Sequence, residues 1–243
     1  MKRLDQGSVA VVGLGEMPDL ALSSSSGGYA AGGATRSVST LGLYGRFGKR
    51  LLDVTLVLLS LPVVLPIITC CALALWWESG LPFYRQDRLG AHGRVFRILK
   101  LRTMVRDADS QLERHLQENP ALRQEWDATQ KLKHDPRITS VGRFLRVTSL
   151  DELPQLWNVL IGDMSLVGAR PMMVQQLPLY GETKSYFALR PGITGLWQVG
   201  ERNETSFQDR AQFDERYCRT LSLVRDLAIL WRTVSVVLKG TGY

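Results

Sequence analysis

The sequence contains 243 residues, enough for one substantial core or for a small core with appendages. Hydrophobic residues make up 45% of the chain, which excludes a wholly disordered protein. The 30 Lys and Arg outnumber the 23 Asp and Glu, and the formal net charge of +7 predicts an anionic partner: nucleic acid, an acidic membrane surface or a phosphorylated substrate. The 3 Cys and 3 His lack the spacing of a zinc site or a disulfide framework, so we expect a reduced, cytosol-facing catalytic part.

Residues 1–45 are rich in Gly, Ser and Ala, a composition typical of a flexible tail. A run of 24 residues without charge follows at positions 54–77. As a straight helix this run would be about 36 Å long, enough to cross a bilayer core of about 30 Å. However, Pro62 and Pro66 lie in its middle, and a proline inside a helix removes a hydrogen bond and clashes with the preceding turn.

Basic residues flank the uncharged run at both ends, namely Arg46, Lys49 and Arg50 before it and Arg85 and Arg88 after it. Because positive flanks favour the cytoplasm, both ends are expected on the same side of the membrane. We therefore predict a re-entrant membrane hairpin over residues 46–79, a helix-break-helix within one leaflet whose break lies at Pro62. A kinked transmembrane helix and a buried helix of a soluble core are the alternatives.

Residues 80–243 are predicted to form a cytosolic catalytic domain. Two short strands, at residues 83–86 and 95–100, are joined by a glycine-containing turn and predict a β-hairpin. The charged segment 105–133 predicts a solvated helix pair that is broken at Pro120.

Two further helices are predicted at residues 207–221 and 223–238. The second has an apolar face at helical spacing, which fits either core packing or a helix lying on the membrane surface. The expected fold class is therefore α+β: mainly helical with a small β-hairpin, an N-terminal re-entrant membrane segment and C-terminal amphipathic interfacial helices.

The motif SLDELPQL at residues 149–156 is the first candidate for chemistry. Locally it reads as a capping box, with Ser149 at the start of a helix and Glu152 three residues later. It also fits an anion site at a helix start, where two adjacent carboxylates hold a divalent cation and one of them attacks phosphorus. Arg146 lies just upstream, and Lys100 and Arg102 end an earlier strand.

Two loop motifs pair Arg with Pro and Gly: GDMSLVGARP at residues 162–171 and RPGITGLWQV at residues 190–199. Arginines on constrained turns suit forked contacts with phosphate oxygens, although plain surface turns explain each motif equally well.

Together with KLRTM at residues 100–104, these motifs occur in an order that resembles the bacterial sugar transferase family, the monotopic phosphoglycosyl transferases. The resemblance covers residues 46–243. The closing KGTGY resembles the rhizobial-type exopolysaccharide enzymes, which transfer galactose phosphate to undecaprenyl phosphate.

The resemblance implies an enzyme that transfers a hexose-1-phosphate, of galactose or glucose, from a UDP-sugar to undecaprenyl phosphate. It releases UMP and initiates exopolysaccharide synthesis at the cytoplasmic face of the bacterial inner membrane. Asp151 would be the nucleophile that forms a covalent phosphosugar intermediate, and Asp151 and Glu152 would hold Mg²⁺. The phosphate- and nucleotide-binding residues would be Lys100, Arg102, Arg146, Arg170, Arg190 and Gln198.

The chain departs from the family pattern at two positions. Leu61 precedes Pro62 where a Ser-Pro pair is usual, with Ser60 one position earlier, and Ala169 stands where Pro is usual. Inner-membrane lipid is an expected partner, and later glycosyltransferases and a homodimer are left open. A non-catalytic membrane scaffold that recruits polysaccharide-assembly enzymes is the alternative function. A nucleic-acid-binding protein is disfavoured because it does not explain the uncharged run and no nucleic-acid motif is visible.

Overall fold

The structure is a computed structural model, and it describes residues 42–129, 132, 134–200, 207 and 209–238. The predicted tail falls almost entirely outside these residues. The described residues contain nine α-helices, four strands and several short helical turns, which confirms a mainly helical α+β fold. The helices are α1 (Lys49–Ser79), α2 (Ala108–Glu118), α3 (Pro120–Thr129), α4 (Ser140–Val147), α5 (Gln155–Ile161), α6 (Leu177–Tyr180), α7 (Lys184–Ala188), α8 (Arg210–Arg219) and α9 (Leu223–Leu238). The strands are β1 (Phe83–Leu89), β2 (Val95–Leu101), β3 (Ser165–Val167) and β4 (Gly192–Thr194).

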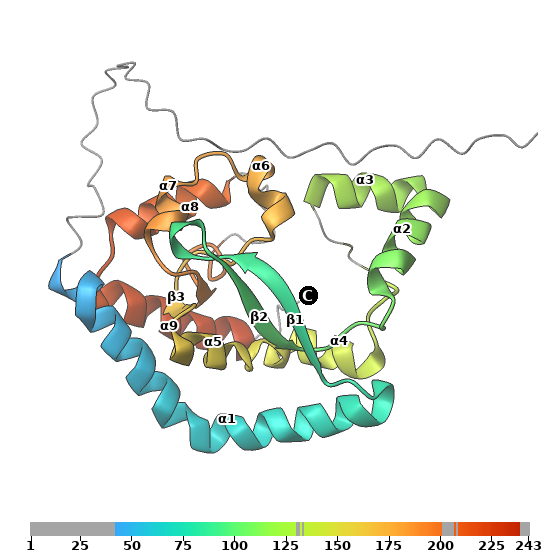
Figure 1. Cartoon of the computed structure of the whole chain (residues 1–243), viewed down its shortest axis with the longest axis horizontal. Helices are drawn as coiled ribbons and strands as arrows, with labels where there is room; N and C mark the ends of the chain where they lie inside the picture. The colour runs from blue at the N-terminus through green and yellow to red at the C-terminus, as the bar shows by residue number, and fades with distance from the viewer. Residues whose placement is uncertain (1–41, 130–131, 133, 201–206, 208, 239–243) are drawn as a thin grey trace, which may run out of the picture. The chain divides into compact units, whose positions relative to one another are not determined.

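Helix α1 follows a π-helical turn, Tyr44–Gly48, and remains helical through both of its prolines. The predicted break into two helices at Pro62 is therefore wrong for the helical path, because the chain keeps its helical backbone there. The helix instead bends near its middle, the part that contains both prolines (Figure 1). Ser60 donates a hydrogen bond to the carbonyl of Val57 at 2.8 Å, the type of local contact that often bends a helix.

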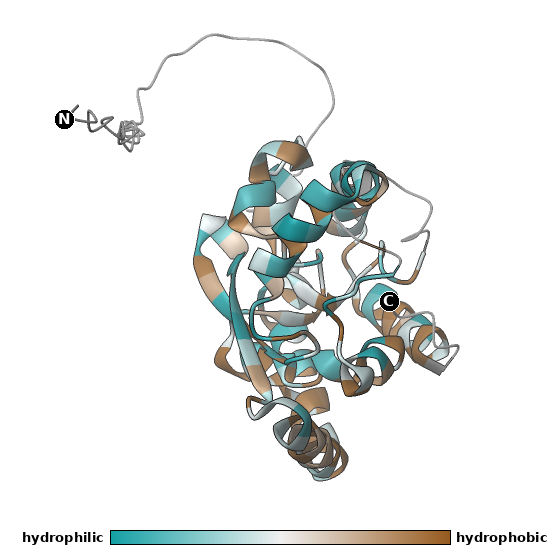
Figure 2. Ribbon diagram, turned by 90° about the vertical axis from the view of Figure 1, so that its right-hand side faces the viewer, coloured by the Kyte–Doolittle hydropathy of each residue, from teal (hydrophilic) through white to brown (hydrophobic). Residues whose placement is uncertain are grey.

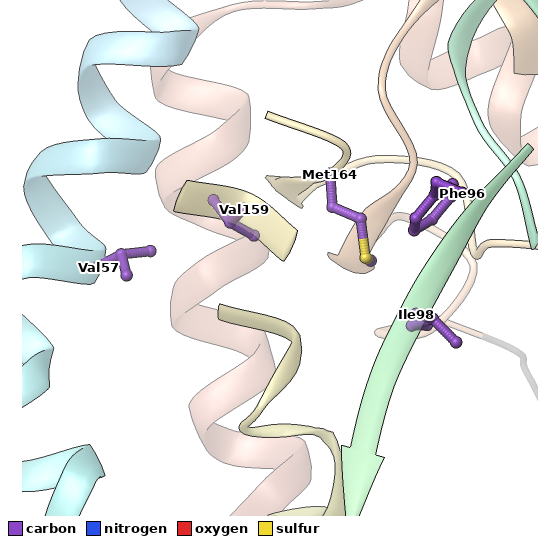
Figure 3. Packing of buried hydrophobic residues seen from close by; sticks show 5 residues of the cluster. All are labelled: Val57, Phe96, Ile98, Val159 and Met164. Atoms are coloured by element: carbon purple, nitrogen blue, oxygen red, sulfur yellow. The ribbon is translucent and has the colours of Figure 1, made fainter. Parts of the chain in front are cut away.

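The stretch Tyr44–Ser79 is long and apolar enough to cross a membrane, and only 6% of its apolar window is buried. Both the N-terminal and the C-terminal half of α1 nevertheless contribute residues to the core. Val57 packs with Phe96, Ile98, Val159 and Met164 (Figure 3). This cluster joins α1 to β2, to α5 and to the residue that precedes β3.

A second core cluster joins the C-terminal half of α1 to β2 and α4. It contains Leu75, which is fully buried, together with Leu101 and Leu145. The helix is thus held at two separated points, while most of the surface between them stays exposed. A buried helix of a soluble core, one of the two alternatives, would not leave this surface open.

The predicted hairpin is confirmed, because β1 and β2 pair antiparallel with Phe83 opposite Leu101 and Leu89 opposite Val95. The turn between them contains His92 and Gly93 in the left-handed region. The predicted charged helix pair is confirmed as α2 and α3, which meet at Pro120, the first residue of α3.

The two arginine-containing loop motifs carry a two-stranded parallel sheet that the sequence did not predict. Strand β3 pairs with β4 so that Ser165 lies opposite Gly192 and Val167 opposite Thr194. The backbones approach very closely beside this sheet. A Cβ atom on Gly192 would lie 2.1 Å from the backbone nitrogen of Gly168, and one on Gly168 would lie 2.5 Å from the carbonyl oxygen of Arg190, so both positions require glycine.

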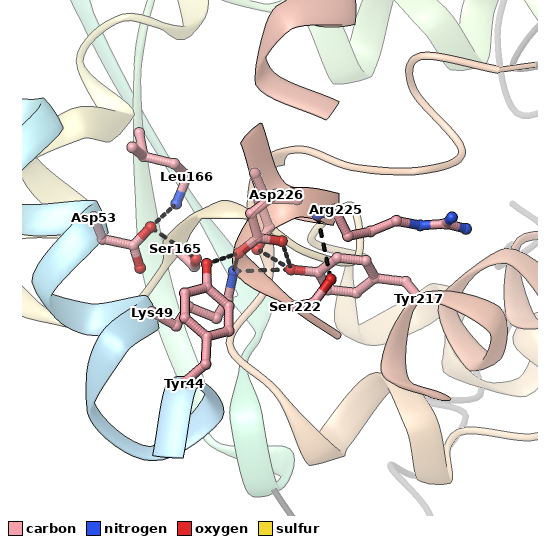
Figure 4. Close-up of polar contacts among 10 residues, drawn as sticks. Tyr44, Lys49, Asp53, Ser165, Leu166, Tyr217, Ser222, Arg225 and Asp226 are labelled. Carbon is pink, nitrogen blue, oxygen red and sulfur yellow. Dashed lines mark hydrogen bonds and ion pairs between the residues drawn. The ribbon is translucent and has the colours of Figure 1, made fainter. Parts of the chain in front are cut away.

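A buried polar network fixes the first turns of α1 (Figure 4). Lys49 Nζ lies 2.7 Å from Asp226 Oδ2, and the two side chains are 7% and 0% exposed. Tyr44 and Tyr217 each donate a hydrogen bond to the same Asp226 carboxylate. One turn further along α1, Asp53 accepts from the hydroxyl of Ser165 and from the backbone of Leu166.

These contacts tie α1 to α9 and to β3, so Lys49 has a structural role beyond its place in the basic flank. Arg50 is also engaged with the domain, because its guanidinium donates to the carbonyls of Val159 and Leu160 at the end of α5. Two of the flanking charges that were used to predict membrane topology therefore hold the protein together.

Large apolar side chains remain exposed on α1, α4, α5 and α9, and they include Trp77, Phe144, Trp157 and Trp231. Figure 2 views the C-terminal half of α1 almost end-on at the bottom of the molecule, where most of its residues are hydrophobic. Such a set is far larger than the scattered apolar residues of an ordinary soluble surface and indicates contact with a partner or a membrane.

Candidate active site

Asp151 and Glu152 lie in a 3-10 turn, Leu150–Glu152, between α4 and α5. The predicted capping box is wrong. Ser149 has φ of 57°, a left-handed conformation, and its side chain makes no capping hydrogen bond. The helix itself begins only at Gln155, so the two carboxylates precede it rather than occupying its first turn. The local motif therefore does not predict the position of the carboxylates, because Glu152 is held by ion pairs with residues from distant parts of the chain.

Glu152 is held between two basic side chains. Its Oε1 atom lies 2.7 Å from Lys100 Nζ and 3.2 Å from the guanidinium of Arg170, and its side chain is 18% exposed. Burial would raise the pKa of Glu152, but Lys100 and Arg170 hold that pKa well below its usual range. The carboxylate therefore stays ionised and orients both cations.

Asp151 is buried, with 8% of its surface exposed. Burial raises the pKa of Asp151, and the charge of Glu152 acts in the same direction. The positive charges of Lys100, Arg146 and Arg170 oppose both effects. The two neighbouring carboxyl groups thus have different environments: Glu152 makes the ion pairs, and Asp151 lies beside them within the same positive field.

Arg146 is positioned by a tight contact between α4 and the chain just after β2. Its Nε atom donates to the hydroxyl of Thr103 at 2.8 Å. One turn earlier in α4, a Cβ atom on Gly142 would lie 2.2 Å from the carbonyl oxygen of Thr103. Glycine at position 142 therefore allows α4 to pack closely enough for Arg146 to reach the dyad.

A pocket opens beside Glu152 on the side of β1, β2 and the Arg170 loop. Its lining combines three cations, one carboxylate and one amide with apolar residues: Arg88, Ile98, Lys100, Glu152, Gln155, Arg170, Pro171 and Ile193. Arg88 was missed as a site residue, although its place in the sequence was noted as part of the basic flank. It reaches the pocket because it lies near the end of β1, where its guanidinium donates to the carbonyl of Pro171.

Tyr186 fixes the loop that contains Arg170 and Pro171. Its hydroxyl donates to the carbonyl of Leu89 at 2.6 Å and accepts from the backbone nitrogen of Met172 at 3.0 Å. This buried hydroxyl bridges the end of β1 and the Arg170 loop, which places Arg88 and Arg170 side by side.

Arg210, at the start of α8, is a second missed residue. Its guanidinium lies over the rings of Trp197 and Phe207, with centroid distances of 4.1 Å and 4.3 Å. Burial lowers the pKa of Arg210 to about 10, and the nearby Arg170 contributes in the same direction. Arg88 has a pKa lowered to about 10 for the same two reasons.

Arg88, Arg170 and Arg210 therefore form a cluster of mutually repelling cations. The Nε atoms of Arg88 and Arg210 are buried and have no hydrogen-bond partner among the described residues. Glu152 pairs with Arg170, but the excess of positive charge and the unused donors favour the binding of a further anion.

The remaining predicted residues are placed differently. Arg102 lies over the ring of Tyr84 at 5.3 Å and donates to the carbonyl of Phe83, so its described contacts lie away from the dyad. Arg190 is exposed. Gln198 is buried beneath the close contact between Gly168 and Gly195, and both polar atoms of its amide lack a partner among the described residues. The pocket lining includes none of these three predicted residues.

The dyad is the candidate for the predicted Mg²⁺ site. No group of three or more His, Cys, Asp or Glu gathers as a metal site within the described residues. Two carboxylates are nevertheless a donor set that suits Mg²⁺, which usually binds proteins through one or two carboxylates and completes its shell with water and substrate phosphates. Because Glu152 is occupied by Lys100 and Arg170, Asp151 is the freer of the two carboxylates for this purpose.

The comparisons with known proteins identify the family of the chain. Residues 44–240 match the sequence profile described as bacterial sugar transferase. The chain belongs to the bacterial sugar transferase family. The dyad, the pocket arginines and α1 all lie within the matched residues.

Three relatives illustrate the range of this family. The chain is 46% identical over 198 residues to the UDP-galactose-lipid carrier transferase of Erwinia amylovora, covering 81% of this chain and 42% of that protein. It is 41% identical over 200 residues to the exopolysaccharide production protein ExoY of Sinorhizobium fredii, covering 82% and 88%. It is 42% identical over 200 residues to the UDP-glucose:undecaprenyl-phosphate glucose-1-phosphate transferase of Caulobacter vibrioides, covering 78% and 69%.

The chain thus spans less than half the length of the Erwinia relative but most of the length of the Sinorhizobium relative. The names of the relatives include both a galactose and a glucose donor, so relatedness alone does not fix the sugar.

Proposed function

We propose that this bacterial sugar transferase moves a hexose-1-phosphate from a UDP-sugar to undecaprenyl phosphate, through a covalent intermediate on Asp151. The observation that carries the proposal is the environment of the dyad: the buried Asp151 and the partly buried Glu152 lie beside a cluster of cations with unused donors. The relatives named as lipid carrier and undecaprenyl-phosphate transferases support the same donor and acceptor classes.

In the first step the carboxylate of Asp151 attacks the phosphorus nearest the sugar. The bond between that phosphorus and the bridging oxygen breaks, and UMP leaves with the electron pair. The obstacle is repulsion between a carboxylate and an anionic diphosphate, and Lys100, Arg170 and Arg88 are placed to offset it. Glu152 supports this step indirectly, because its two ion pairs hold Lys100 and Arg170 beside the pocket.

In the second step an oxygen of undecaprenyl phosphate attacks the phosphorus of the phosphosugar–Asp151 intermediate. The acyl phosphate bond breaks, Asp151 is restored as a carboxylate, and undecaprenyl diphosphate-sugar is released. An acyl phosphate keeps much of the energy of the anhydride it replaced, so the second transfer can proceed. Asp151, with help from Glu152, would hold Mg²⁺, which supplies charge neutralisation for the diphosphate when bound.

The surface next to this site fits a lipid acceptor. The helix α1 contacts α4 and α5, the two helices that flank the dyad, and all three expose large apolar side chains such as Trp77, Phe144 and Trp157. Helix α9 adds a further apolar face that includes Trp231. We propose that these helices rest in the cytoplasmic leaflet of the bacterial inner membrane, with α1 entering and leaving on the same side.

The proposal is tested by measuring UMP release from UDP-galactose and UDP-glucose, with and without undecaprenyl phosphate. Wild type is expected to release UMP, with sustained turnover only when the acceptor lipid is present. Asp151→Asn should lose UMP release by several orders of magnitude and should form no covalent adduct detectable by mass spectrometry. The matched control Asp109→Asn, on the exposed surface of α2, should retain full activity.

Unchanged UMP release by the Asp151→Asn variant would refute the nucleophile. A wild-type chain that binds the membrane but releases no UMP would instead favour the scaffold alternative. The preferred sugar follows from the ratio of kcat/KM values for the two donors.

A further inference from the structure

We infer that Gln155 contacts the substrate, its side-chain amide donating a hydrogen bond to a phosphoryl oxygen of the bound nucleotide-sugar. This inference rests on the proposed function and adds a residue to it. Gln155 is the first residue of α5 and follows Asp151 by four positions. It lines the pocket together with Glu152, Lys100 and Arg170.

The position of Gln155 is unusual for an amide. The residue is only 1% exposed, and its Nε2 atom is buried without a hydrogen-bond partner among the described residues. A buried polar group without a partner destabilises a fold, so an apolar residue of similar length would be more favourable at a purely structural position. The unused donor therefore indicates a partner that arrives with the ligand.

Asn158, one turn further along α5, is a useful contrast. It is 2% exposed, and both ends of its amide are satisfied by β2: Oδ1 accepts from the backbone of Leu99 at 2.9 Å, and Nδ2 donates to the carbonyl of Arg97 at 2.8 Å. Asn158 thus shows what a structural amide looks like in this helix. Gln155 lacks such protein contacts for its nitrogen, although the two residues share the same helix and the same degree of burial.

The charges that line the pocket indicate which ligand atom Gln155 contacts. Arg88, Lys100 and Arg170 surround the same space, so the bound oxygens in it are expected to be anionic. An amide nitrogen is a donor and complements a phosphoryl oxygen without adding charge. The inference therefore assigns Gln155 to a phosphoryl oxygen rather than to a sugar hydroxyl.

The experiment compares Gln155→Met with wild type in three measurements on the full chain in detergent or nanodiscs. Methionine keeps the length of the side chain and removes the donor. The variant is expected to melt at the same temperature as wild type or higher, because no hydrogen bond within the protein is lost. It should bind UDP about 10- to 100-fold more weakly and lose a similar factor in kcat/KM for UMP release, as expected for a bond to a charged acceptor.

Two further variants sharpen the result. Asn158→Leu is expected to lower the melting temperature clearly, since it removes two internal hydrogen bonds. Gln155→Glu is expected to weaken UDP binding more than Gln155→Met does, because it adds a negative charge where an anion binds.

Three outcomes would overturn the inference: equal UDP affinity in Gln155→Met and wild type, a melting temperature that falls as in Asn158→Leu, or UDP binding retained by Gln155→Glu. If wild type binds UDP but releases no UMP from any UDP-sugar, the proposed function fails, while the UDP-binding comparison still tests Gln155.

Discussion

The buried ion pair between Lys49 and Asp226 provides a direct test of how α1 is held. The change is Lys49→Met, which keeps the length of the side chain and removes its charge. Asp226 is then left fully buried without its cation, although Tyr44 at 2.6 Å and Tyr217 at 2.7 Å still donate to it. Removing one partner of a buried pair typically costs about 3–5 kcal/mol, and the two tyrosines place the expectation near the lower end of that range.

For a domain of this size, about 1 kcal/mol shifts the melting temperature by roughly 2–4 °C, so the expected loss is on the order of 6–12 °C. Thermal unfolding of the protein in nanodiscs, followed by circular dichroism, measures this shift. The double variant Lys49→Met with Asp226→Asn removes both charges and should recover at least half of the loss, because no uncompensated charge remains buried.

The exposed pair Arg219–Glu215 provides a matched control. Its atoms approach to 2.6 Å, as close as the buried pair, but its side chains are 64% and 47% exposed. Arg219→Met should therefore change the stability by less than about 1 kcal/mol. The reasoning is refuted if Lys49→Met costs no more than Arg219→Met, or if the double variant loses as much as the two single variants added together.

Two further predictions concern Asp214 and Ser149. Burial raises the pKa of Asp214 to about 7 despite its hydrogen bond from Tyr180, so the folded protein keeps a proton that the unfolded chain loses near 3.8, and stability falls as pH rises between these values. Asp214→Asn removes this dependence, so its stability should rise relative to wild type between pH 5 and pH 8 by at most about 3 kcal/mol, measured as a growing difference in melting temperature. A difference that stays constant over this range would contradict the assignment. Ser149→Gly should be at least as stable as wild type, because glycine suits φ of 57°, whereas a lower melting temperature would restore the helix-cap interpretation.

The sequence alone determined those features that depend on neighbours along the chain. The β1–β2 hairpin followed from two short strand-like segments on either side of a glycine-containing turn, and the division between α2 and α3 followed from Pro120. The start of α9 at Leu223 matched the prediction from its apolar period. The candidate dyad, Lys100, Arg146 and Arg170 were found through motifs, and their convergence in one positive field agrees with that prediction. The assigned roles of these residues stay predictions.

Tertiary structure decided what local sequence could not contain. The motif around Ser149 has the sequence of a helix cap, but its backbone lies in the left-handed region, and Glu152 pairs with Lys100, a residue from a distant strand. The parallel β3–β4 pair joins two segments that the sequence predicts as turns. Neither strand has enough residues to give a periodic signal.

Arg88 and Arg210 lie in no motif that was recognised, and they become site residues only because Tyr186 and the ring of Trp197 hold their surroundings in place. The same holds for Lys49, which the sequence places in the basic flank that predicts membrane orientation, and which forms a buried ion pair in the fold. Local patterns record what a segment forms on its own, whereas burial and charge pairing depend on which distant segments meet it.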